Sequence, residues 1–245
     1  DKEIILKGRK QYPNTHKTFF NSKDTTYAVS NRKLRKSMKE TKAKSFWRFW
    51  KTSKLIDQNY EDDKRNLILE YNKKGYRDAQ IKYDTSYMNI DNTMSLEITI
   101  EEGNTYQFGK VSFTGNTIYN SEQLSNTLGI KEGDVFDQSV LDARLFGGAD
   151  GSDISSLYLD DGYLFFNANP VEIGIASGKI DIEVRIYEGK QARVNKVMVK
   201  GNTKTNDHVI MRELRTLPGD LFKRSDIMRS QRELAQMQYF DPEKF

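Results

Sequence analysis

The chain has 245 residues, of which 36% are hydrophobic and 30% are charged, and it carries a formal net charge of +4. With only four prolines, this composition is typical of a folded chain and excludes a disordered one. No apolar run reaches the roughly 18 residues that a membrane-spanning helix needs. The absence of cysteine excludes disulfides and thiolate sites. The length allows one large domain or two to three small ones.

Three short motifs recur at one fixed distance along the chain. They are Glu102-Gly103 with Glu188-Gly189, Gly115-Asn116-Thr117 with Gly201-Asn202-Thr203, and Gly133-Asp134-Val135-Phe136 with Gly219-Asp220-Leu221-Phe222. Each pair is 86 residues apart (103 to 189, 115 to 201, 133 to 219). A fixed period of this size indicates a tandem array of small modules, and such arrays usually present surfaces to partners.

The first module is predicted over residues 1–106. Its first strand is expected over Glu3–Leu6, before Gly8, and an insertion or a break follows near residues 9–31. Leu34 and Met38, four residues apart, are expected to face a core. A helix over 57–74 and strands over 78–87 and 94–101 complete the module.

The second module, over residues 107–191, has the clearest pattern. A strand over 110–114 ends at Gly115, and Asn120 caps a short helix that Gly129 ends. A second helix over 138–146 is interrupted at 147–151 and resumes from a Ser152 cap to residue 159. Strands over 163–175 and 179–187 form a hairpin around a Ser177-Gly178 turn. The predicted order is strand, helix, helix, strand, strand.

The third module is predicted over residues 192–245 and is incomplete. A strand over 194–200 and helices over 205–214 and 225–237 repeat the first half of the second module. The closing hairpin is missing, so we expect the natural protein to continue past Phe245.

The order and spacing of these elements resemble POTRA (polypeptide-transport-associated) domains. The shared features are the Gly-Asn turn after the first strand, the Gly-Asp-x-Phe element between the helices, and the Gly-Tyr pairs at 75–76 and 162–163. The runs 33–39, 75–79 and 157–166 are also similar to bacterial outer-membrane assembly factors. The resemblance implies an α+β fold with two helices on a small three-stranded sheet in each module. The sequence departs from the POTRA pattern in the first module, where Lys44–Trp50 stands in place of Gly-Asp-x-Phe.

The resemblance further implies a periplasmic scaffold and chaperone region of an outer-membrane β-barrel assembly factor. Its implied partners are unfolded outer-membrane proteins, accessory subunits of the assembly complex, and the protein's own C-terminal membrane β-barrel. Two alternatives stay open. One is the POTRA region of a related barrel translocator, TamA-like or of two-partner secretion. The other is a nucleic-acid-binding module built on the basic segment 32–54, for which a steep loss of oligonucleotide affinity with salt would be diagnostic.

The sequence contains no arrangement typical of catalysis. His16 and His208 are the only histidines and stand in unrelated contexts, so no metal-ligand cluster or His-based triad is predicted. The glycine-rich stretch 147–152 lacks the Gly-Lys-Ser/Thr ending of a phosphate loop. The acidic residues between 150 and 161 lack calcium-loop spacing. We therefore expect no enzyme, no catalytic residue, no metal and no cofactor.

The second strand of each module resembles the exposed edge strand of POTRA domains. An edge strand can pair with an extended client without reading much of its sequence. In the second module the predicted client contacts are Phe165, Phe166, Val171, Ile173 and Ile175. Pro170 removes one N–H donor there. The alternative is that 164–175 supplies only core residues.

A basic segment rich in aromatics follows in the first module. Residues 32–54 hold ten Lys and Arg against one acid, Glu40. The predicted partner or membrane-surface contacts within it are Phe46, Trp47, Arg48, Phe49, Trp50 and Lys51. Such a mixture suits lipid headgroups or a protein partner, and nucleic acid less well. A solvated helix face over a partial core explains the same pattern.

Overall fold

The computed structural model describes residues 3–11, 28–39, 57–88, 90, 93–148, 151–202 and 205–237. Contacts divide the chain into two compact units. The first comprises residues 1–108, 133–138 and 176–180, and the second comprises 109–132, 139–175 and 181–245. Within the described residues, no helix is long and apolar enough to cross a membrane.

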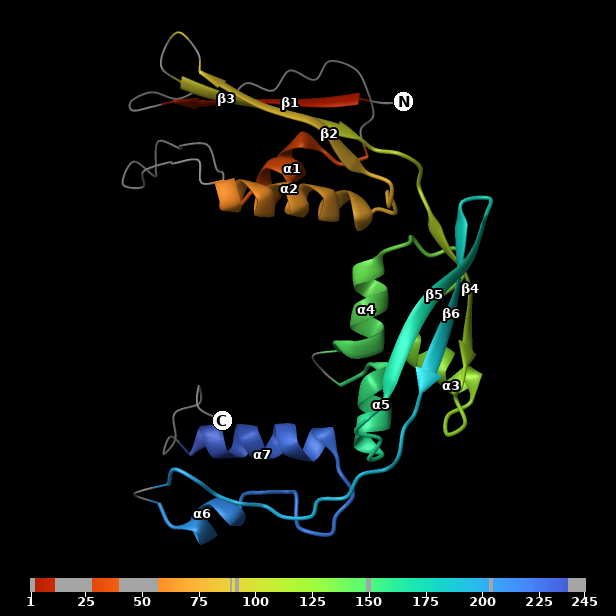
Figure 1. The fold of residues 1–245 in the computed structure, drawn as a ribbon, viewed down its shortest axis with the longest axis vertical. Helices are drawn as coiled ribbons and strands as arrows, with labels where there is room; N and C mark the ends of the chain where they lie inside the picture. Colours follow the sequence, from red (N-terminus) through yellow and green to blue (C-terminus); the bar gives the residue numbers. More distant parts are fainter. Residues whose placement is uncertain are drawn as a thin grey trace. The chain divides into compact units, whose positions relative to one another are not determined.

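The first unit contains a three-stranded antiparallel sheet covered by helices. Its elements in chain order are β1 (Glu3–Gln11), α1 (Asn31–Ser37), α2 (Asp57–Asn72), β2 (Gln80–Met88) and β3 (Thr93–Glu101). The strand order is β1-β3-β2, so β1 and β2 form the edges. Figure 1 shows α1 and α2 together on one face of this sheet. The predicted strand, helix, helix, strand, strand order is confirmed in this unit.

The first strand is longer than predicted. It does not end before Gly8, which lies opposite Leu96 of β3, but continues to Gln11 opposite Thr93. The strand passes through the glycine because β3 offers a ladder partner at every position. The insertion or break predicted near residues 9–31 falls mostly on residues 12–27, outside the described part of the chain.

The core of the first unit forms between α1, α2 and the sheet. Leu34 is fully buried, as predicted, and Met38 packs against the same cluster. The period of two along β3 turns Ile98 and Ile100 toward the helices, where their exposures are 1% and 0%. Burial of an aliphatic side chain of this size contributes roughly 1.5–3 kcal/mol. These residues therefore offset part of the cost of ordering the chain.

The remaining elements contain a second three-stranded sheet, in the order β4-β6-β5. They are β4 (Gln107–Thr114), α3 (Ser121–Leu128), α4 (Gln138–Phe146), α5 (Ile154–Asp160), β5 (Asn167–Ala176), β6 (Lys179–Tyr187), α6 (Asp207–Met211) and α7 (Arg224–Gln236). Figure 1 shows α4 and α5 one after the other beside this sheet. The predicted α+β fold with small three-stranded sheets is confirmed.

Local signals set the ends of the helices. Asn120 and Gln123 form a reciprocal capping box at the start of α3, and Gly129 ends the helix in the left-handed conformation at φ 64°. The predicted Ser152 cap of α5 is wrong. Asp153 is the N-cap instead, because its carboxylate accepts from the N–H of Ser156 at 2.6 Å.

The core of the second unit lies between its helices and β6. Leu124, Leu128, Leu141 and Leu145 are 0–1% exposed. On β6, Ile182 and Val184 are buried to the same degree, and Ile186 is 8% exposed. This fits β6 being the central strand, which is covered on one face by helices and flanked on both sides by strands.

The stretch before α6 differs from its prediction. A strand over 194–200 does not form, because an extended segment needs a ladder partner. In the described part of the chain this region has a single bridge, Arg193 to Leu221. The helix predicted over 205–214 is shorter, from Asp207 to Met211. The helix predicted over 225–237 is confirmed as α7 within one residue at each end.

Candidate functional site

β5 is the candidate binding element because it is an edge of the sheet β4-β6-β5. An edge strand presents backbone N–H and C=O groups that can pair with an incoming extended segment. Three of the predicted contact residues lie on this strand. Val171 is half-buried, whereas Ile173 and Ile175 are 56% and 55% exposed. We call these three residues the apolar edge.

The other two predicted contacts lie before the strand. β5 begins at Asn167, so the strand start predicted near Tyr163 is four residues too early. Turns form there instead, closed by hydrogen bonds such as that from the N–H of Phe166 to the C=O of Tyr163 at 3.0 Å. Phe165 is 65% exposed. Phe166 stacks on Tyr158 with ring centroids 4.3 Å apart.

The hairpin turn fixes which backbone groups of β5 point outward. Ser177 and Gly178 both have positive φ, 51° and 75°, which defines a two-residue type I′ turn. The residues that flank such a turn, Ala176 and Lys179, form a hydrogen-bonded pair. Hydrogen-bonded and non-hydrogen-bonded pairs alternate along the hairpin, so Ile173 and Ile182 form a non-hydrogen-bonded pair. The N–H and C=O of Ile173 therefore point to the open side. Consistent with this, the C=O of Ile182 points to β4, where it accepts from the Ser112 hydroxyl at 3.3 Å.

The same pairing decides which face the apolar edge belongs to. Residues directly opposite each other in a sheet share a face. Ile182 is 1% exposed and faces the core, so Ile173 points to the same side although more than half of its surface is open. The apolar face of the sheet thus continues past its helical cover at β5.

β2, the corresponding edge of the first unit, is more polar on its core-facing side. After Ile81, which packs against the core opposite Ile100, the core-facing positions carry Asp84, opposite Ile98, and Ser86, opposite Leu96. The Asp84 carboxylate lies 3.2 Å from the ammonium of Lys64 on α2. Charged side chains on an edge discourage strand addition, so the two edges are not equivalent.

Two of the repeated motifs meet in the folded chain. The Glu188 carboxylate accepts from the N–H of Thr117 at 2.7 Å, the N–H of Ile118 at 3.0 Å, the Thr117 hydroxyl and the Tyr158 hydroxyl at 3.0 Å. Burial raises the pKa of Glu188, but these hydrogen bonds outweigh burial and hold the pKa below its ordinary value. Glu102 accepts likewise from the N–H of Ala28 at 3.2 Å. Sequence analysis found the Glu-Gly repeat but missed this anchoring role.

The Gly-Asp-x-Phe motif makes the same backbone pairing twice. In each copy one residue, three positions after the glycine of the Glu-Gly repeat, donates its N–H to the Gly of a Gly-Tyr pair, and its C=O accepts from the N–H of the Phe of the motif. The bonds are Tyr106 N–H to Gly75 C=O (2.8 Å) and Phe136 N–H to Tyr106 C=O (3.0 Å), then Ala192 N–H to Gly162 C=O (2.8 Å) and Phe222 N–H to Ala192 C=O (3.0 Å). The motifs recognised in the sequence therefore share one structural role.

Side chains of α5 hold the start of α7. The N-cap of α7, Lys223, makes no capping hydrogen bond with its side chain. Asp160 supplies one instead, since its carboxylate accepts from the N–H of Ser225 at 2.7 Å. Arg224 donates to the Ser156 hydroxyl at 3.0 Å and lies 3.9 Å from the Asp153 carboxylate.

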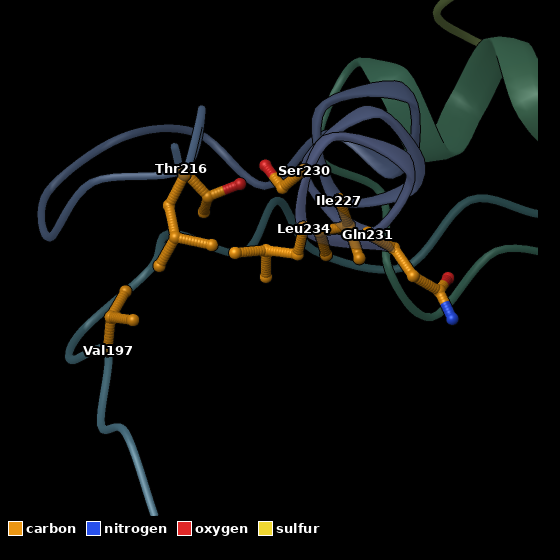
Figure 2. A pocket seen from close by; sticks show the side chains of 7 residues that line it. Val197, Thr216, Ile227, Ser230, Gln231 and Leu234 are labelled. Carbon is orange, nitrogen blue, oxygen red and sulfur yellow. The ribbon is translucent and has the colours of Figure 1, made fainter. Parts of the chain in front are cut away.

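A groove of about 500 Å³ opens beside α7. It is lined by Val197, Leu214, Thr216, Ile227, Ser230, Gln231 and Leu234. Figure 2 shows Ile227 and Leu234 of α7 across from Val197 and Thr216. Leu214 and Ile227 stand 86 residues after Leu128 and Leu141, which are 1% and 0% exposed in the second unit. The groove is thus lined by residues that match that core in the repeat, and the incomplete third module stays a prediction.

The aromatic contacts predicted in the basic segment lie outside the described residues. These are Phe46, Trp47, Arg48, Phe49, Trp50 and Lys51. Their role stays a prediction. Within the ranges that the structure describes, no group of three or more His, Asp or Glu is placed to hold a metal ion.

The fold and the repeated pairing define a tandem array of small α+β modules. The family model for POTRA, the surface antigen variable number repeat, matches residues 106–189 and 192–244. The chain therefore belongs to the POTRA family, as its sequence motifs predicted.

Known relatives agree with this assignment. The chain is 27% identical over 219 residues to the outer membrane protein assembly factor BamA of Neisseria meningitidis serogroup B, covering 88% of this chain and 27% of the relative. It is 29% identical over 220 residues to BamA of Neorickettsia risticii, covering 89% and 28%. The chain thus spans about a quarter of the length of these curated relatives. The predicted location, the periplasm as part of an outer-membrane-anchored protein, is confirmed.

A solved structure shares the fold. The crystal structure of POTRA domains 3 to 5 of BamA from Haemophilus influenzae superposes with a TM-score of 0.64 at 21% identity. The match covers 87% of this chain and 82% of that one.

Proposed function

We propose that this chain is a non-catalytic scaffold that binds unfolded outer-membrane protein strands by adding them to β5. The observation that carries the proposal is the apolar edge, where outward backbone groups and exposed apolar side chains coincide. Its similarity to outer-membrane assembly factors favours barrel strands as clients, because these strands alternate apolar and polar residues. It also favours assembly over the translocator alternative.

The geometry suits an amphipathic strand. The backbone of a client would pair with the N–H and C=O of Ile173, and its alternate apolar side chains would extend the face of Ile173 and Ile175. In this register the backbone groups of Val171, Ile173 and Ile175 point outward, so the pairing would run from Val171 toward the turn, whereas Pro170 occupies an alternate position that faces β6. The edge β2, where Asp84 pairs with Lys64 of α2, lacks this combination. We therefore assign the client site to β5 rather than to both edges.

The decisive experiment is titration of the chain with an unfolded barrel peptide while backbone amide shifts are followed by NMR. Ile173→Pro removes an outward N–H without removing a bond to β6, so binding should weaken about fivefold for each client hydrogen bond lost. Ile173→Val keeps the N–H and is the matched control, expected to bind nearly as well as the parent. Shifts confined to the helices, with β5 silent, would exclude strand addition here.

The accessory subunits and the C-terminal membrane β-barrel belong to the same proposal. Similarity to BamA supports contacts with other components of an assembly complex. Co-purification of each candidate subunit with the chain is the direct measurement.

A further inference from the structure

One surface of the first unit carries charge of a single sign. All four exposed side chains of α1 are basic, namely Arg32, Lys33, Arg35 and Lys36, and the exposed Lys39 follows the helix. Leu34 points the other way, into the core. We call these five residues the basic face.

One lysine of the basic face shares its carboxylate partner with a lysine of the neighbouring chain segment. Glu70 of α2 lies 2.9 Å from the ammonium of Lys33 and also 2.8 Å from that of Lys73. The hydrogen bonds from Lys73 and Lys33 lower the pKa of Glu70. One carboxylate is therefore shared by two lysines, and Lys74 adds a further ammonium, which donates to the C=O of Ala28. Residues 28–39 themselves contain five basic side chains and no acidic one, so this segment is strongly positive.

The fold does not require this charge. α3 occupies the same place in its module, with Leu124 buried as Leu34 is. Its exposed side chains are neutral or acidic, namely Ser121, Glu122, Gln123, Ser125 and Asn126. Like charges three and four residues apart, such as Arg32 with Lys36, destabilise a helix. Arg35 and Lys36, in the last turn, interact favourably with the helix dipole, whereas Arg32 and Lys33, near the start of the helix, do not. The basic face therefore costs stability that a binding role would explain.

We propose that the basic face binds the phosphate groups of an anionic membrane surface. Residues 28–39 expose no large apolar side chain, whereas a protein partner would be expected to need apolar or aromatic anchors. An array of lipid headgroups requires only spread positive charge, and guanidinium and ammonium groups both bind phosphate. The periplasmic location places such a surface within reach. The proposal does not depend on strand addition at β5.

The test is flotation of the whole chain with phosphatidylcholine vesicles that contain or lack phosphatidylglycerol. Each basic residue near an anionic surface contributes about 1 kcal/mol, or about fivefold in partitioning. The double variant Arg32→Glu/Lys36→Glu should therefore bind phosphatidylglycerol vesicles at least about 25-fold more weakly. Lys190→Glu/Lys196→Glu makes the same change in net charge at exposed positions elsewhere and should bind like the parent.

Several outcomes would overturn the proposal. Equal loss in both double variants would show an effect of net charge alone. Equal binding to vesicles without phosphatidylglycerol would remove the role of anionic headgroups. Displacement from vesicles by inorganic phosphate at matched ionic strength would indicate a free-phosphate site, and tight lipid-free binding of a poly-glutamate peptide would indicate an acidic partner. Circular dichroism confirms that each variant is folded before it is scored.

Discussion

Replacing Gly115 by alanine should be far more damaging than the same replacement at Gly201. The two glycines occupy the same place in the Gly-Asn-Thr repeat and have nearly the same φ, +82° and +85°. An added Cβ at Gly115 would lie 2.2 Å from the carbonyl oxygen of Ile186 on β6. At Gly201 it would meet nothing within 4 Å. The pair therefore separates backbone strain from a steric clash.

The size of each effect follows from the geometry. A left-handed conformation costs an alanine roughly 1–2 kcal/mol, and both variants bear this cost. Relief of the contact with Ile186 requires a shift of the β6 backbone, for which overpacking typically costs about 1–3 kcal/mol. Gly115→Ala should thus lose roughly 2–5 kcal/mol, against 1–2 for Gly201→Ala. The larger loss is a sizeable part of the 5–15 kcal/mol that stabilises a typical domain.

Thermal unfolding and hydrogen exchange measure this difference. For a module of this size, Gly115→Ala should lower Tm by at least about 8 °C. The amides of β6 should also exchange faster, since β6 is the strand displaced. Gly201→Ala should leave β6 protection unchanged. If the two variants lose equal stability, the close approach between Gly115 and β6 is not a feature of the folded protein.

Three further predictions concern single side chains. The pKa of Glu188 is lowered, so the stabilisation by its carboxylate is complete above the ordinary pKa of 4.5 and is lost as pH falls through the lower folded pKa. Glu188→Gln should therefore flatten the fall of the unfolding free energy between about pH 5 and 3. An unchanged slope would contradict the anchoring role. Asp160→Ala should cost about 1 kcal/mol by removing the cap of α7, seen as faster exchange at Ser225, and unaltered exchange there would argue against the cap. At least one of Trp47→Ala and Trp50→Ala should harm assembly activity or complex formation more than thermal stability, because four large aromatics within five positions cannot all face one core. If both variants only lose roughly 3–5 kcal/mol of unfolding free energy, the role of these residues is structural.

Much of the local structure could be predicted from the sequence. The capping residues Asn120 and Gly129 and the i, i+4 spacing of Leu124 and Leu128 define α3 without any tertiary information. The clean alternation of apolar residues along β6 and the Ser177-Gly178 turn define the hairpin in the same way. These signals are readable because their interactions act between residues that are close in the chain.

Tertiary contacts decided the rest of the site. No local pattern shows that Ile173 and Ile175, on the core-facing side of β5, remain exposed. Nor does any local pattern show that Asp84 of β2 lies beside Lys64 of α2. The role of Glu188 also depends on Thr117, which lies 71 residues away. The stretch 194–200 has strand periodicity but forms no strand, because hydrogen-bonding partners come from elsewhere in the fold. Periodicity sets which side of an element is apolar, whereas only packing of distant segments decides whether that side is covered.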